Sequence, residues 1–193
     1  ITLIEDDKRL GNPEAIQVQL PYSKDWFGVP PNVHIIGTMN TADRSVEALD
    51  TALRRRFSFT EMPPKSELIK TEGKTENGIV NGIDLPALLE TINKRIEKLL
   101  DKDHMIGHSY FLSVKDLKDL KSAFQNKIVP LMQEYFFGDY GKIGLIIGSK
   151  FFDIKDNQVD EDFFAPFEDY DSSPLVERKV YHLKNIQDMS DEL

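Results

Sequence analysis

A change of hydrophobic period near residue 85 constrains the fold of this chain most. From there, leucine and isoleucine recur every three or four residues and form one helical stripe: Leu85, Leu88, Leu89, Ile92, Ile96, Leu99 and Leu100. Asp84 precedes this stripe as a helix cap, and Pro86 fits the first turn. A second apolar stripe runs from about 114 to 137, and Pro130 should split or kink it. We therefore expect a small all-helical domain at residues 85–148.

The first third of the chain follows a different pattern. Residues 33–39 form a short β-branched and apolar run, typical of a strand buried on both faces of a parallel sheet. A helix is expected from about 45 to 54, and Phe57-Ser58-Phe59 alternates as a strand does. The apolar start, Ile1-Thr2-Leu3-Ile4, has no capping residue before it, so we interpret it as the end of a buried helix that begins upstream. Residues 1–62 thus predict an α/β fold.

Two segments differ from both regions. Residues 63–84 are polar and rich in Lys, Glu, Gly and Asn, which predicts a linker or mobile loop. Within them, Gly73-Lys74-Thr75 imitates the end of a phosphate-binding loop, but Leu68 stands where that loop requires glycine, so we reject this site. Residues 149–193 form an acidic and aromatic C-terminal extension, with a final strand expected at 179–183.

Composition excludes several classes of site. The chain has 193 residues and no cysteine, which rules out disulfides and thiolate metal sites and favours a cytoplasmic protein. It has no apolar run of transmembrane length, so no membrane partner is expected. The balance of 24 basic and 33 acidic side chains gives a net charge of −9, a poor match for nucleic acid. His34 and His182 lack metal-ligand spacing, and we expect no metal site in this chain.

Polar residues directly after the run at 33–39 are the first candidates for catalysis. An amide such as Asn40 at a strand tip can hold a water or a phosphate oxygen, and Asp43 and Arg44 add an acceptor and a cation. The alternative is that these residues only cap the next helix. Three successive arginines, Arg54-Arg55-Arg56, cannot share one helical face, so one can point toward a neighbouring subunit. The alternative there is a basic helix end that interacts with its own dipole.

The combination I-G-T-M-N-T-A-D-R-S, a short helix, then A-L-R-R-R-F resembles the second half of the AAA+ core in McrB-type GTPases, the motor subunits of McrBC modification-dependent restriction systems. Residues 1–9 resemble the helix after the Walker B strand of that family. The resemblance implies that Asn40 is the sensor-1 residue that orients the attacking water. It places Asp43 and Arg44 in the M-N-x-x-D-R signature tied to GTP use and to stimulation by the partner. Arg55 and Arg56 are the candidate trans-acting arginines, with Arg55 the first choice.

Residues 103–111 and 128–137 resemble the helical lid of the same family, where the I-G-H-S-Y-F run lies near the nucleotide. Gly107, His108 and Ser109 are therefore candidate nucleotide-binding residues, with a buried structural histidine as the alternative. Some family relatives carry an arginine near the start of this run. Here Asp103-His104-Met105 stands instead, so no sensor-2 arginine is assigned.

Taken as a whole, the resemblance implies the C-terminal part of an AAA+ P-loop NTPase core followed by a small α-helical lid. Such a protomer would hydrolyse GTP, or ATP in less typical relatives, with Mg²⁺ and nucleotide held mainly by residues outside this chain. It would form a homo-oligomeric ring, activate a McrC-like nuclease subunit, and rely on other domains or subunits for DNA. Because Walker A and B motifs are absent, the isolated chain should hydrolyse no nucleotide. Two alternatives remain: an ATP-dependent remodeller outside restriction, and a non-catalytic interaction module.

Overall fold

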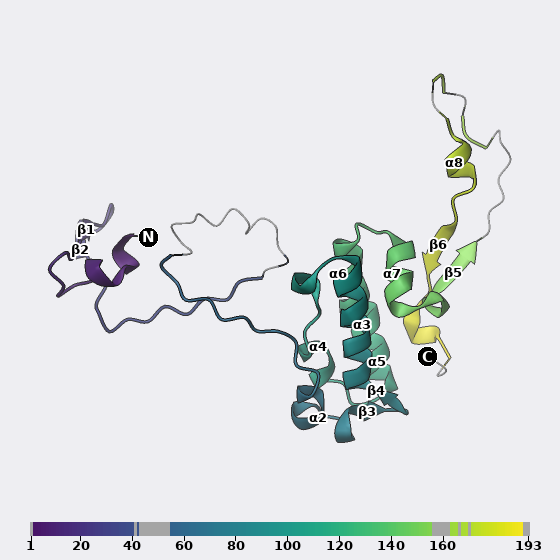
Figure 1. Ribbon diagram of the computed structural model, residues 1–193, viewed down its shortest axis with the longest axis horizontal. Helices are drawn as coiled ribbons and strands as arrows, with labels where there is room; N and C mark the ends of the chain where they lie inside the picture. Colours follow the sequence, from purple (N-terminus) through teal and green to yellow (C-terminus); the bar gives the residue numbers. More distant parts are fainter. Residues whose placement is uncertain are drawn as a thin grey trace. The chain divides into compact units, whose positions relative to one another are not determined.

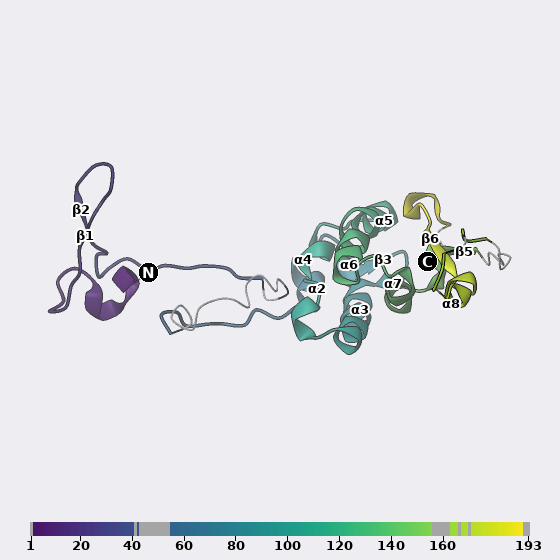
Figure 2. The ribbon, with the colours of Figure 1, turned by 90° about the horizontal axis from the view of Figure 1, so that it is seen from above.

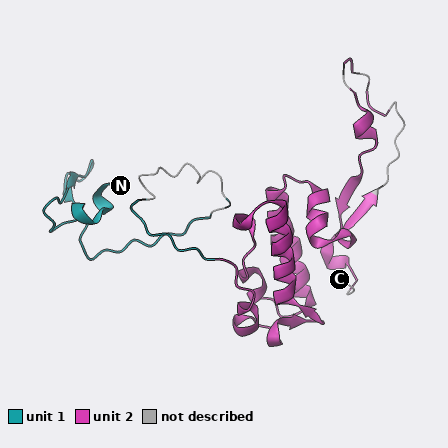
Figure 3. Ribbon diagram, in the orientation of Figure 1, with its two compact units in different colours: residues 1–62 teal, residues 63–193 magenta. Residues whose placement is uncertain are grey.

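The computed structural model describes residues 2–40, 42, 55–155, 163–165, 167–169 and 171–190. The chain divides into two compact units, Ile1–Met62 and Pro63–Leu193 (Figure 3). In the described part of the chain, no helix is long and apolar enough to cross a membrane.

The first unit is built from short elements. Two 3₁₀ turns, η1 (Thr2–Ile4) and η2 (Asp6–Lys8), precede an antiparallel hairpin of β1 (Val18–Gln19) and β2 (Trp26–Phe27). Val29 is buried, and its carbonyl accepts a hydrogen bond from the Leu10 N–H at 2.8 Å. This contact joins the turns to the hairpin.

The described residues of this unit do not by themselves form the α/β sheet expected from the sequence. Residues 33–40 carry no strand, and Ile36 is 94% exposed, because a strand needs neighbours to pair with and none of the described residues supplies one. Residues 57–59 likewise form no strand, and residues 2–4 form an unburied 3₁₀ turn rather than the end of a buried helix. The helix expected at 45–54 lies outside the described residues.

The second unit is predominantly helical (Figure 1). A short helix and a hairpin lead into it, followed by the helices of the main bundle. Their bounds are α2 (Leu68–Glu72), η4 (Glu76–Gly78), β3 (Ile79–Val80), β4 (Ile83–Asp84), α3 (Leu85–Leu99), η5 (Lys102–His104), α4 (Ser109–Leu112), α5 (Leu117–Ala123), the π-helical turn η6 (Phe124–Ile128), α6 (Val129–Tyr135) and α7 (Tyr140–Ile147).

Helix α3 confirms the expectation from the first apolar stripe. The Asp84 carboxylate caps it by accepting a hydrogen bond from the Ala87 N–H at 3.0 Å, and Pro86 lies in the first turn. The side chains facing the core are at most 1% exposed: Leu85, Leu89, Ile92 and Ile96. Burial of each stabilises the fold by about 1.5–3 kcal/mol, so this face fixes α3 in the bundle.

The second apolar stripe forms a helical path that changes its hydrogen-bonding pattern without breaking. Pro130 lies in the first turn of α6, and the π-helical turn comes directly before it. Proline has no N–H to donate to the carbonyl four residues earlier, so the regular ladder cannot continue there. Backbone angles at Ala123 and Val129 stay α-helical, and the expected interruption therefore appears as a π turn.

Residues 63–84 are not the linker that their polar composition predicts. Ile69 of α2 is fully buried and Val80 of β3 is 3% exposed, and both belong to the core of the second unit. Gly73 is the C-cap of α2, and a Cβ there would lie 2.2 Å from the Ile69 carbonyl oxygen, so this close approach requires glycine. The Lys74 N–H donates to the Leu112 carbonyl at 3.2 Å, so this glycine-lysine-threonine sequence is a helix stop packed against α4.

The C-terminal extension is partly integrated into the helical unit. It contains η7 (Ser149–Phe151), β5 (Phe152–Lys155), α8 (Ser173–Val176), β6 (Val180–Leu183) and η8 (Ile186–Asp188). Strand β6 confirms the expected final strand and pairs antiparallel with β5, from Phe152 with Leu183 to Lys155 with Val180. Phe152 and Ile186 are buried in the same core as α3. Figure 2 shows this hairpin beside α7.

Candidate functional site

Asn40 lies in the first unit with its side chain exposed. Its amide oxygen accepts a hydrogen bond from the Ala42 N–H at 3.2 Å, which forms a local turn of the kind Asn side chains favour. The amide is accessible to a ligand and is not sealed inside packing. Asp43 and Arg44, its expected companions, lie outside the described residues.

Arg55 and Arg56 differ in their surroundings, although they are adjacent in sequence. Arg56 is half-buried, and its Nε and Nη2 atoms both approach one carboxylate oxygen of Glu5. Arg55 is exposed, and both arginines line a pocket of about 370 Å³ together with Glu5 and Arg9. The Arg9 guanidinium donates hydrogen bonds to the backbone carbonyls of Ile4 and Val33, within its own chain.

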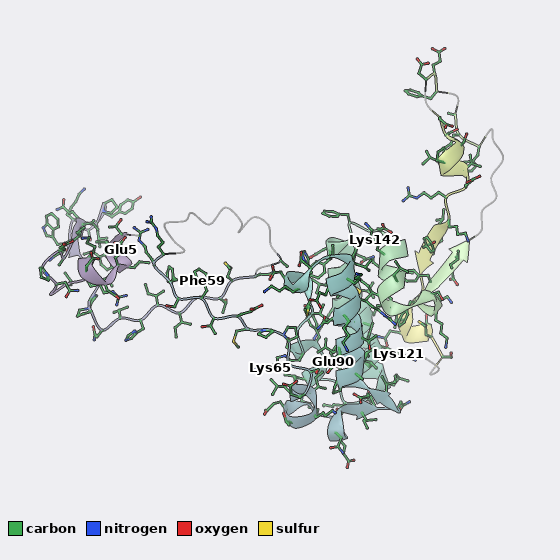
Figure 4. The ribbon with its side chains drawn as sticks, viewed as in Figure 1. Glu5, Phe59, Lys65, Glu90, Lys121 and Lys142 are labelled. Carbon is green, nitrogen blue, oxygen red and sulfur yellow. The ribbon has the colours of Figure 1, made fainter. Side chains whose placement is uncertain are left out.

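These different surroundings favour different roles for the two candidate arginines. Arg56 faces a carboxylate of its own chain, which favours a structural role, whereas the guanidinium of Arg55 is exposed and suited to bind an anionic oxygen. The third member of the triplet, Arg54, lies outside the described residues. Glu5, which Figure 4 labels in the first unit, was not singled out by the sequence analysis. Its position in the acidic run Glu5-Asp6-Asp7 gave no sign of a partner 51 residues away.

His108 holds the segment that leads into the helical unit. Its Nδ1 atom accepts a hydrogen bond from the Lys65 N–H at 3.1 Å, and its carbonyl accepts from the Phe111 N–H at 3.0 Å. A neutral imidazole that accepts at Nδ1 carries its proton on Nε2. Through these two hydrogen bonds, His108 joins residue 65 to the start of α4. His108 is also half-buried, and both observations support the structural alternative for this histidine. Ser109, the first residue of α4, is exposed, and Gly107 is half-buried.

Asn93 fixes the position of this lid loop, and the sequence analysis did not identify it. The Asn93 side chain is only 6% exposed. Its Nδ2 donates to the Ile106 carbonyl at 3.0 Å, and its Oδ1 accepts from the Ile106 N–H at 2.8 Å. This pair of hydrogen bonds holds the residue just before Gly107 and His108 against α3. A polar residue between the buried Ile92 and Ile96 was the signal in the sequence that could have revealed it.

His104 lies shortly before the I-G-H-S-Y-F run and is part of a structural cluster. Its Nδ1 lies 2.7 Å from Asp101 Oδ1, and its ring meets the Tyr135 ring edge-on at a centroid distance of 4.9 Å. The hydrogen bond with His104 lowers the pKa of the Asp101 carboxyl below its ordinary value, and the backbone N–H groups of Asp103 and His104 add to the effect. Burial raises the pKa of the Tyr135 hydroxyl. This cluster stabilises the loop that precedes the I-G-H-S-Y-F run.

The candidate residues therefore form two groups in different compact units. Asn40, Arg55 and Arg56 belong to the first unit, and the lid residues around His108 belong to the second. The described residues contain no group of three or more His, Asp or Glu side chains placed to hold a metal ion. The exposed amide and guanidinium of the first group are suited to bind phosphate oxygens or a water molecule.

Comparison with known proteins matches residues 84–144 to the family described as "McrB, alpha-helical lid domain". The chain is 38% identical over 156 residues to the "Type IV methyl-directed restriction enzyme EcoKMcrB subunit" of Escherichia coli (strain K12), an alignment that covers 71% of this chain and 32% of that protein. It is 28% identical over 156 residues to the "Type II restriction enzyme BsuMI component YdiS" of Bacillus subtilis (strain 168), covering 77% of this chain and 44% of that protein. The chain thus spans less than half the length of these relatives. It is a McrB-type chain, related to a restriction-enzyme subunit over most of its length and carrying the family's α-helical lid domain at residues 84–144.

Proposed function

We propose that this chain supplies the sensor, the arginine finger and the lid of a nucleotide-hydrolysing subunit in a DNA restriction complex. The subunit assembles into a homo-oligomeric ring, uses GTP with Mg²⁺, powers DNA translocation and activates a McrC-like nuclease partner. The relationship to the E. coli restriction subunit over 71% of the chain supports the restriction complex. DNA is held by other domains or subunits, in keeping with the net charge of −9.

One observation carries the catalytic part of the proposal: Arg55 is exposed beside a pocket, while the adjacent Arg56 is held by Glu5 of its own chain. A finger must leave its own protomer to neutralise charge on the phosphoryl group transferred in the next one. Arg55 has the freedom to do this, and the Arg56–Glu5 pair anchors the turn that presents it. We therefore retain Arg55 as the finger and assign Arg56 a positioning role.

Asn40 orients the attacking water in this proposal. Nucleotide hydrolysis depends mainly on positioning and on charge stabilisation, which a neutral amide and a fixed guanidinium together provide. Mg²⁺, when bound, would supply charge neutralisation for the phosphate groups. In this proposal the ion and the triphosphate are held mainly by residues outside this chain.

In this proposal the lid contacts the bound nucleotide through its loop at residues 107–109. Asn93 and the Asp101–His104 pair hold this loop on its bundle, and His108 links it to Lys65 at the start of the second unit. The exposed Ser109 hydroxyl is the group that we assign to nucleotide contact.

The test is to substitute the two arginines separately in the full-length protein. Arg55→Ala should abolish GTP turnover while nucleotide affinity stays nearly unchanged, because the finger acts on developing charge rather than on ground-state binding. A loss of about 10³-fold or more is typical of such a residue. Arg56→Ala should lower the stability of the first unit by about 0.2–1 kcal/mol, as expected for a partly exposed ion pair. Unchanged turnover in Arg55→Ala would remove Arg55 from the role, and an assay of ATP against GTP would separate this proposal from an ATP-dependent remodeller.

A further inference from the structure

Two successive prolines, Pro63 and Pro64, stand at the start of the second unit. Proline has a fixed φ and no backbone N–H, so this dipeptide is stiff and cannot donate a hydrogen bond to its surroundings. Lys65 therefore carries the first backbone N–H of the unit. We call residues 63–66 the entry segment, and its path depends on what the residues after the prolines bind.

Two side chains of the helical unit hold the entry segment. His108 Nδ1 accepts a hydrogen bond from the Lys65 N–H at 3.1 Å, and the Ser66 hydroxyl donates to Glu90 Oε1 of α3 at 2.7 Å. Figure 4 labels Lys65 and Glu90 in this unit. We call these two hydrogen bonds the entry clamp. Because the two acceptors belong to different elements, the clamp fixes the entry segment at two independent points.

The helices that follow the entry segment are secured without the clamp. Helix α2 is held by the fully buried Ile69 and by the Lys74 N–H, which donates to the Leu112 carbonyl at 3.2 Å. Both clamp bonds lie at the surface, where water can replace a lost partner at small cost. The clamp therefore determines the path of the entry segment more than the stability of the helices.

One end of the clamp lies inside the lid loop. His108 stands between Gly107 and Ser109, and the Asn93 side chain holds the residue just before Gly107. The bond from His108 to Lys65 joins this loop to the entry segment with no residue between them. Because the donor and acceptor are 3.1 Å apart, a shift of about 0.5 Å in the loop is enough to break the bond.

We propose that His108 is a positioning residue that couples nucleotide contact at the lid loop to the path of the entry segment. This inference rests on the proposed function, in which residues 107–109 contact the nucleotide. A nucleotide that moves the loop changes the bond between His108 Nδ1 and the Lys65 N–H, while the Ser66–Glu90 bond keeps the segment on α3. The stiff Pro63-Pro64 dipeptide then changes its direction as one piece.

The experiment measures backbone hydrogen exchange in the full-length protein, with and without GTPγS and Mg²⁺. Because prolines have no amide hydrogen, a peptide that begins at residue 63 reports exchange from Lys65 onward in mass spectrometry. Without nucleotide, His108→Phe should speed exchange of the Lys65 amide by about three-fold to ten-fold, as expected for one lost hydrogen bond. The nucleotide should change this exchange by about three-fold or more in the unmodified protein and leave it unchanged in His108→Phe.

A second variant, His108→Asn, separates the hydrogen bond from the ring. Phenylalanine keeps a ring without an acceptor, whereas asparagine keeps an acceptor oxygen attached to Cγ, as Nδ1 is in histidine. His108→Asn should therefore restore both the protection of Lys65 and its response to the nucleotide. Thr91→Ala is the matched control: it removes a hydrogen bond to the Ala87 carbonyl on α3, next to Glu90, and should leave both readouts unchanged.

A response to the nucleotide that persists in His108→Phe, or is lacking in the unmodified protein with GTPγS bound, would overturn the coupling. Equal losses in His108→Phe and His108→Asn would assign the effect to the ring and overturn it as well. Nucleotide binding and GTP turnover are measured on the same samples. Turnover without the response contradicts only the coupling, and the response without turnover contradicts only the proposed hydrolysis. A full-length protein that binds no GTPγS would overturn both.

Discussion

At the residue scale, a buried amide has the largest effect on the candidate lid site. Asn93 satisfies both the N–H and the carbonyl of Ile106, so its removal leaves two buried backbone groups without a partner. Such groups are costly because the core around them offers no water. The loop that carries Gly107 and His108 therefore depends on a side chain that contacts neither residue's functional atoms.

We expect Asn93→Ala to lower the free energy of unfolding by about 2–4 kcal/mol, as the sum of two lost hydrogen bonds and the desolvation of their partners. Urea denaturation followed by circular dichroism measures this change. Asn126→Ala is the control, because Asn126 is exposed and its Nδ2 donates a hydrogen bond to the Ser122 hydroxyl at 3.0 Å. Its effect should stay within about 0.5 kcal/mol. Equal losses in the two variants would contradict the role assigned to Asn93.

Asp101 makes the lid sensitive to acid. Because its pKa in the folded lid lies below the ordinary value of 3.8, the folded state binds fewer protons here than the unfolded state near pH 4. Its stabilising contribution is therefore complete above that pH and disappears as the pH falls through the lowered value. Between pH 6 and pH 3, the thermal stability of the unmodified protein should fall more than that of Asp101→Asn, as measured by thermal unfolding. The control is Asp103→Asn, two residues away, whose thermal stability should fall as much as that of the unmodified protein. An equal fall in Asp101→Asn would contradict the role assigned to Asp101.

The roles of some single residues could be predicted from the sequence, and those of others could not. A cap such as Asp84 was predictable because its role depends on the three residues that follow it. The pairing of Glu5 with Arg56 was not, because it joins residues 51 positions apart and neither type of side chain specifies its partner. The same holds for the bond between His108 and Lys65, which uses a backbone N–H that no sequence pattern marks.

At the scale of elements, local periodicity predicted the long helices. It failed for segments whose structure depends on tertiary contacts. Helix α3 and strand β6 appear where the patterns placed them. Residues 63–84 are anchored by Ile69 and Val80, two apolar side chains without a regular spacing, and their polar composition concealed this. The run at 33–39 has the composition of a buried strand, but a strand forms only when a neighbour supplies its hydrogen bonds.

The C-terminal element stabilises the lid through Ile186, which is fully buried. We expect Ile186→Ala to lower the free energy of unfolding by about 2–5 kcal/mol, through lost apolar burial and the cavity left behind. Leu175→Ala in α8 is the control within the same extension, because Leu175 is 37% exposed, and its effect should be about 1 kcal/mol or less. Chemical denaturation of both variants tests this, and an unaffected Ile186→Ala variant would show that the extension does not support the lid.

At the scale of the whole molecule, the proposed hydrolysis requires two protomers to share one pocket. Asn40 and Arg55 lie in the same compact unit, yet the proposal has them act in different pockets. In the proposed ring, Asn40 would serve the nucleotide of its own protomer and Arg55 that of the adjacent one. Contacts of this head-to-tail kind close into a ring when the rotation between protomers permits.

Mixing two inactive full-length variants, Asn40→Ala and Arg55→Ala, tests this claim most directly. Each alone should hydrolyse GTP at least about 10²-fold more slowly than the unmodified protein. In an equimolar mixed ring, roughly a quarter of the interfaces pair an intact Asn40 with an intact Arg55, so turnover should return to a comparable fraction of the unmodified rate. A mixture in which rings exchange subunits but turnover stays at the level of the separate variants would contradict a pocket shared between protomers.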